Sequence, residues 1–110
     1  MRVAIPISYD GVARVFDTAT RLLIVDVTGD SGCERVEVPT FVRPPIYRAR
    51  ELASLGVGIL LCEGVSHDLA DRITEQGIGI EPPASANVDH AISAILRHRP
   101  RRASRTAHAA

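Results

Sequence analysis

The residues most able to do chemistry lie together at positions 59–68. An apolar run at residues 59–61 is followed by Cys62, by a turn at Gly64 and by Ser66, a favourable N-cap for a helix. A strand would therefore carry a thiol to the start of a helix, where N–H groups and the helix dipole favour an anion. The candidate residues of this stretch are Cys62 and His67 as ligands and Gly64, Val65 and Ser66 as N–H donors.

The two cysteines also have simpler interpretations. A single cysteine at the end of a buried strand is commonly a small core residue, and Cys62 fits that description. Cys33 lies in a weakly apolar stretch far from any predicted helix start, which indicates an edge-strand residue without a chemical role. Two cysteines are too few for the disulfide framework of a small secreted domain. We therefore expect a cytoplasmic, reduced protein with both thiols free.

Composition and charge narrow the class of protein. The chain has 110 residues, of which 45% are hydrophobic, enough for one domain with a core. No apolar run approaches the roughly 20 residues of a membrane span, and the N-terminus does not resemble a secretory signal. All basic residues are arginines, and five of them lie beyond position 96 without an acid. We expect a domain over residues 1–97 and a disordered basic tail over 98–110. The mildly acidic domain argues against binding of nucleic acid.

The periodicities predict an α/β protein with the element order β-β-β-α-β-α-β-α. The alternation at 33–38, with charged residues, is typical of an edge strand protected from aggregation. After Pro44 and Pro45, an apolar stripe predicts a helix that ends at Gly56. The stripe consists of Ile46, Ala49, Leu52, Ala53 and Leu55. Ser66 and Asn87 are expected to cap two further helices. The predicted strands cover residues 2–8, 21–27, 33–38, 57–62 and 78–80, which gives a mixed five-stranded sheet.

Ligands of open α/β sheets bind beyond the carboxyl ends of the parallel strands. If the first strand runs parallel to the fourth, their ends meet with that of the last strand, which contributes Glu81. Tyr9 and Asp10 would then lie beside Cys62 in one cleft. Asp17 is expected to hydrogen-bond within its own turn, as short acids commonly do.

Several motifs resemble a known family when taken as a set. These motifs are Ala4-Ile5-Pro6, Val15-Phe16-Asp17 leading into residues 22–27, Ala53-xx-Gly56-Val57, and Cys62-x-Gly64. They resemble the dinitrogenase iron–molybdenum cofactor biosynthesis family over residues 1–97. The resemblance implies a ribonuclease H-like fold and the binding or carriage of an iron–sulfur or iron–molybdenum-type cluster, rather than turnover of a substrate. It also implies a partner protein that donates or accepts that metallocofactor.

The chain departs from the family pattern at two positions, and other functions remain open. Many members have a small residue in place of Glu63, and several carriers have a histidine in place of Val15. The first alternative is a ligand-free regulatory or scaffold domain. The second is a metal-dependent nuclease using Asp10, Asp17 and Asp26, although Asp26 should lie at the opposite end of the sheet from Asp10. The sequence does not determine the oligomeric state.

Overall fold

The structure is a computed structural model that describes residues 1–27 and 33–97. The predicted loop at 28–32 and the predicted basic tail at 98–110 lie outside the described residues. In the part of the chain that is described, no helix is long and apolar enough to cross a membrane. Residues 88–97 are helical. The other elements are β1 (Arg2–Ser8), β2 (Gly11–Val12), β3 (Arg21–Val27), β4 (Cys33–Pro39), α1 (Pro45–Ser54), β5 (Val57–Leu61), α2 (His67–Glu75) and β6 (Gly79–Glu81).

The strands form one mixed sheet with the order β4-β3-β1-β5-β6. β1 runs antiparallel to β3, and β5 runs parallel to β6. β1 also runs parallel to β5, which fulfils the condition under which the strand ends meet at one edge. The prediction of five strands was wrong, because β2 pairs with the end of β1 as a sixth strand. Gly11 has φ +133° and reverses the chain so that Ile7 faces Val12. A strand of two residues has no alternation that a sequence pattern could detect.

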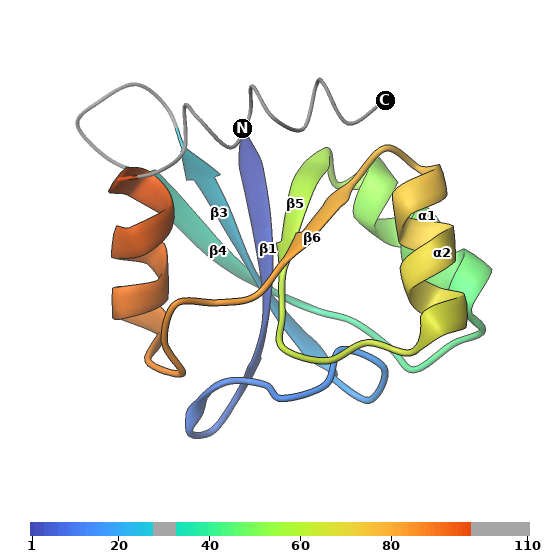
Figure 1. The fold of residues 1–110 in the computed structure, drawn as a ribbon, viewed down its shortest axis with the longest axis horizontal. Helices are drawn as coiled ribbons and strands as arrows, with labels where there is room; N and C mark the ends of the chain where they lie inside the picture. The colour runs from blue at the N-terminus through green and yellow to red at the C-terminus, as the bar shows by residue number, and fades with distance from the viewer. Residues whose placement is uncertain (28–32, 98–110) are drawn as a thin grey trace.

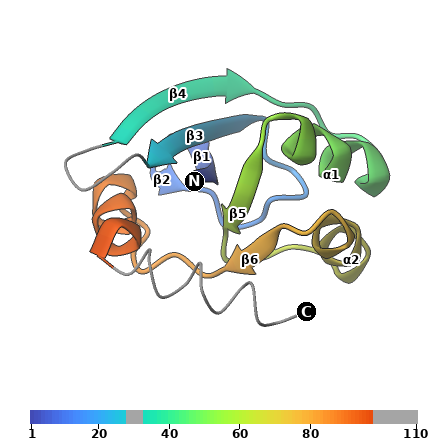
Figure 2. The ribbon, with the colours of Figure 1, turned by 90° about the horizontal axis from the view of Figure 1, so that it is seen from above.

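Helices cover both faces of the sheet. Helices α1 and α2 lie over one face, and the helix at 88–97 lies over the other (Figures 1 and 2). Alternation along β1 divides the core accordingly. Ala4 belongs to the apolar cluster under α1 and α2, whereas Val3 and Ile5 belong to the cluster under the helix at 88–97. Each central strand is therefore buried on both sides, which explains its nearly continuous apolar sequence.

Both predicted helix caps are confirmed. The Ser66 hydroxyl accepts a hydrogen bond from the Leu69 N–H at 3.4 Å, and Asn87 Oδ1 accepts one from the His90 N–H at 3.0 Å. A side-chain acceptor at the N-cap satisfies one of the N–H groups that lack a partner within the helix. Ser66 therefore fixes the start of α2 directly after the predicted site.

The face that α1 buries differs from the predicted stripe. Ala49 and Leu52 are buried as expected, but Ile46 and Ala53 are exposed. Arg48 is buried in their place, with 1% of its surface accessible. The face of α1 that is buried is thus rotated from the predicted apolar stripe so that it includes Arg48. Hydropathy alone would place an arginine on the exposed face of a helix.

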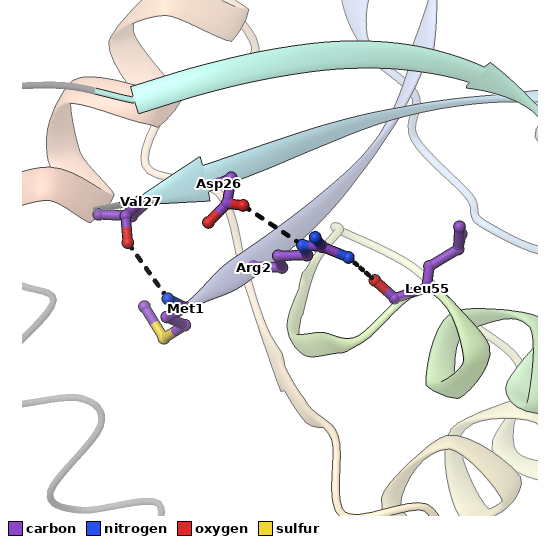
Figure 3. A network of polar contacts seen from close by, with 5 residues as sticks. All are labelled: Met1, Arg2, Asp26, Val27 and Leu55. Carbon is purple, nitrogen blue, oxygen red and sulfur yellow. Dashed lines mark hydrogen bonds and ion pairs between the residues drawn. The ribbon is translucent and has the colours of Figure 1, made fainter.

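The start of β1 fastens the sheet to the end of α1 (Figure 3). The Arg2 guanidinium donates to the carbonyl oxygen of Leu55 at 2.8 Å and lies 3.4 Å from Asp26 Oδ2. The terminal ammonium of Met1 donates to the carbonyl oxygen of Val27 at 3.2 Å. Asp26 is therefore paired at the end of the sheet opposite to the one where Asp10 follows β1.

Candidate functional site

The carboxyl ends of β1 and β5 lie at the same edge of the sheet, where two loops meet. These loops follow β1 and β5, and Figure 1 shows both at the lower edge. Val15 forms a parallel bridge with Gly64, and the Phe16 N–H donates to the Gly64 carbonyl at 2.9 Å. A Cβ on Gly64 would lie 3.1 Å from the carbonyl oxygen of Arg14. Glycine at position 64 therefore allows the two loops to touch.

Cys62 lies directly after β5 but is not presented to solvent. Only 3% of its surface is accessible, and it packs in the cluster under α1 and α2. Its N–H donates to the Glu81 carbonyl at 3.0 Å, so the backbone here continues the pairing with β6. Burial raises the pKa of the Cys62 thiol to about 11, and the negative charge of Asp17 adds to the shift. The expectation of a thiolate stabilised by the dipole of α2 was wrong, because desolvation disfavours the charged form.

Asp17 is an acidic residue that contacts the predicted site directly, at the start of α2. Its Oδ1 atom accepts a hydrogen bond from the Ser66 N–H at 2.8 Å. Asp17 was expected to hydrogen-bond within its own turn, and its partner at Ser66, 49 residues away in the sequence, was not predicted. A carboxylate at this position is favoured by the N-terminal end of α2. One of the three N–H groups assigned to an anion is thus already used by the protein. The signal in the sequence was the Phe16-Asp17 pair within the motifs of the family resemblance.

Arg48 holds the loop that carries Asp17. Its guanidinium donates to the carbonyl oxygens of Asp17 at 2.9 Å and Ala19 at 2.8 Å. It also lies 4.3 Å from the centre of the Phe16 ring, within the range of a cation–π contact. The Thr40 hydroxyl lies 3.4 Å from this guanidinium and donates to Glu51 Oε1 at 2.6 Å. The sequence pattern of α1 did not indicate Arg48, because the partners of its guanidinium come from distant parts of the chain.

The remaining predicted site residues do not share one cleft with Cys62. Tyr9 is 99% exposed and lines a hollow of about 420 Å³ together with residues 18–21. Asp10 and Glu63 line a second hollow of about 490 Å³, which shares Ser8 and Arg14 with the first. Glu81 lines a third hollow on the side of the helix at 88–97. The strand ends meet at one edge, but Cys62 lines none of these three hollows.

Two further candidate residues are placed by the structure at the start of α2. His67 is the first residue of the helix and is exposed. Val65 is partly buried against the core cluster. Cys62 and His67 thus flank the connection from β5 to α2, one facing the interior and the other solvent.

This donor set does not fit a permanently bound iron–sulfur cluster. Such clusters are usually held by four thiolates, sometimes with histidine replacing two of them. In residues 1–27 and 33–97, no three side chains of His, Cys, Asp or Glu are grouped so that they could hold a metal ion. A cluster at Cys62 and His67 would therefore be a weakly held cargo, with the remaining ligands supplied from elsewhere.

Comparison with known proteins places the chain in a family. The model of the family described as "Dinitrogenase iron-molybdenum cofactor" matches residues 1–98. The chain belongs to this family. The match covers all of the described elements, including both loops at the site. No curated protein sequence is significantly similar to this chain.

Several solved structures have the same fold as this chain. The crystal structure of PH0822 is 25% identical, with a TM-score of 0.72 over 87% of this chain and 90% of that one. A candidate dinitrogenase of Methanocaldococcus jannaschii is 21% identical, with a TM-score of 0.71 over 88% of each chain. A candidate NifB protein from Thermotoga is 25% identical, with a TM-score of 0.70 over 89% of each chain. The mixed α/β architecture of the family is thus the architecture of this chain.

The chemical state of Cys62 gives a direct prediction. At pH 8 the fraction of Cys62 in the thiolate form should be about 10²-fold smaller in the folded protein than for an unperturbed cysteine. Alkylation of Cys62 should be slower by about that factor in the folded protein than in urea, as peptide mapping by mass spectrometry would measure. Equal rates in the two states would contradict the buried, protonated thiol.

The same thiol makes stability depend on pH. The folded pKa of Cys62 lies above the unfolded value, so the stabilisation is complete below about pH 8.5. It should be lost as the pH rises toward 11, by about 2 kcal/mol, because the unfolded chain releases the proton first. Urea unfolding at pH 8 and pH 10.5 would measure this loss, and Cys62→Ala should lack it.

Proposed function

We propose that this accessory protein binds or carries an iron–sulfur-type metallocofactor as cargo, in the context of nitrogenase cofactor biosynthesis. The proposal assigns Cys62 as the soft protein ligand and His67 as the second ligand. Membership of the dinitrogenase iron–molybdenum cofactor family is the observation that carries it. The partner would be a protein that donates the cofactor or accepts it, and both exchanges would take place in the cytoplasm.

The donor set suits a carrier better than a storage protein. One thiol and one imidazole bind a cluster loosely, so the cargo can pass to a partner that offers more ligands. Binding must displace the thiol proton of Cys62, because the thiolate is the metal ligand. It must also open the packing around the thiol, since the Cys62 side chain is buried in the cluster that includes Ala13 and Phe16.

Reconstitution with iron and sulfide under anaerobic conditions tests the proposal. Wild type should develop charge-transfer absorption, which Cys62→Ala should remove and His67→Ala should weaken. Cys33→Ala serves as the matched thiol control and should leave the absorption unchanged. Circular dichroism should first establish that each variant is folded. Equal iron uptake by wild type and Cys62→Ala, or no uptake by either, would contradict the carrier function.

Two acidic residues should oppose the binding of an anionic cargo. Asp17→Asn keeps an oxygen acceptor for the Ser66 N–H but removes the negative charge that adds to the effect of burial in raising the pKa of Cys62. Glu63→Gly removes the exposed carboxylate of the residue that follows Cys62 in the sequence. Both should strengthen binding, whereas Asp71→Asn, the same kind of change on an exposed part of α2, should not. Between pH 7 and 9 the apparent affinity should rise about tenfold per unit, because one thiol proton is released.

The alternative is a ligand-free regulatory or scaffold domain. The specific observation in its favour is the burial of Cys62 among apolar side chains of the core. In that case Cys62→Ala would change only stability, and no variant would alter iron uptake. The reconstitution experiment separates the two functions.

A further inference from the structure

Among the described strands, β4 forms one edge of the sheet and pairs on one side only. It pairs with β3 and ends the strand order. Figure 2 shows β4 as the outermost strand, and none of the described helices lies against its free edge. Near the middle of the strand, Val36 is 60% exposed. Uncovered edge strands offer unpaired N–H and C=O groups to another strand.

The hydrogen bonds to β3 determine which backbone groups are free. The Thr40 N–H donates to the Thr20 carbonyl at 2.9 Å, one step beyond the pair Arg21 and Pro39. Hydrogen-bonded and non-hydrogen-bonded pairs alternate along antiparallel strands. The even-numbered residues of β4 therefore direct their backbone groups toward β3. The odd-numbered ones direct theirs to the free edge, which suits Pro39, because it has no N–H to donate.

The charges on β4 favour one register in which the strand could pair with β4 of a second copy. A two-fold axis at Arg35 or at Glu37 would place like charges opposite each other, which is destabilising. An axis at Val36 places Arg35 of each copy opposite Glu37 of the other. Each such pair would exchange two backbone hydrogen bonds through its outward-facing groups. We propose that β4 pairs with β4 of a second copy of this chain in this register, so that the sheet continues across a two-fold axis.

The side chains around the axis support the same arrangement. Val36 would face its own copy as a non-hydrogen-bonded pair, the kind in which side chains approach most closely. Arg35 already contacts Asp89 at 3.0 Å, and Glu37 contacts Arg21 at 2.7 Å. The new contacts would join these ion pairs into a row of alternating charge across the interface. The charges that protect this edge from unrelated strands would thus match a second copy.

A charge exchange tests the register. Sedimentation velocity should find a concentration-dependent dimer of the wild type. Arg35→Glu and Glu37→Arg should each raise the dissociation constant at least about tenfold, because each places like charges opposite one another twice. The double variant Arg35→Glu with Glu37→Arg should restore the dimer. Arg50→Glu, on the exposed side of α1, is the control and should have no effect.

A crosslink provides a second measurement that does not depend on charge. In a Cys33→Ser background, Val36→Cys should form a disulfide-linked dimer, because Cα atoms of a non-hydrogen-bonded pair lie about 4.5 Å apart. Glu34→Cys should not, since residue 34 would lie opposite residue 38 of the other copy. A wild type that stays monomeric up to about 1 mM would overturn the proposal. So would a dimer that neither the charge variants nor Val36→Lys affects.

Discussion

Replacing Arg48 with methionine should lower the free energy of unfolding by about 3 kcal/mol. The substitution keeps the unbranched apolar stem of the side chain but leaves the carbonyl oxygens of Asp17 and Ala19 without the guanidinium that donates to them. It also removes the cation–π contact with Phe16. Unsatisfied buried polar groups are costly, because they have exchanged water for no other partner. Urea unfolding followed by circular dichroism would measure the change.

The effect of Arg48 should extend to the candidate site. Without its anchor, the loop that carries Asp17 should release the Ser66 N–H, so Cys62 should be alkylated faster in the folded variant. Arg50→Met in the same helix is the matched control, and its stability should stay within about 0.5 kcal/mol of the wild type. If the two methionine variants were equally stable, Arg48 would not be the residue that holds this loop.

Replacing Gly11 with alanine should be nearly as damaging, with a loss of about 3 kcal/mol. Gly11 has φ +133°, a backbone conformation that residues with a side chain rarely adopt. A Cβ at this position would also overlap the carbonyl oxygen of Ala86. That oxygen accepts a hydrogen bond from the Val12 N–H at 2.9 Å and so joins β2 to the segment before the last helix. Thermal and urea unfolding would measure the loss.

A second glycine gives the cost of a positive φ without an overlap. Gly77 also has a positive φ, at +82°, but a Cβ there would meet no atom within 4 Å. Gly77→Ala should therefore cost about 1 kcal/mol, from backbone strain alone. The excess at Gly11 should come from the overlap with the Ala86 carbonyl and from the rarer backbone conformation at φ +133°. Similar losses at both positions would show that a Cβ at position 11 is accommodated without a further cost.

Much of the architecture was predictable from local patterns. The strands at residues 2–8 and 21–27 and the caps at Ser66 and Asn87 follow from hydrophobic periodicity and from hydrogen bonds between near neighbours. The parallel pairing of β5 with β6 follows from topology, since the two strands are joined by α2 and a right-handed crossover favours it. The position of Cys62 at the end of β5, in front of α2, follows in turn. These features depend on a few adjacent residues or on general rules of chain connection.

The chemistry at the same place was decided by residues distant in sequence. The type and position of Cys62 allowed both a ligand and a buried core residue, and the tertiary structure surrounds it with core side chains and Asp17, which keep it protonated. The buried Arg48 could not be inferred from α1, because its partners lie at Asp17, Ala19 and Thr40. Burial and electrostatic environment are sums over all neighbours in space. The sequence therefore determined where the candidate site lies, whereas only the tertiary structure decided the protonation state of its thiol.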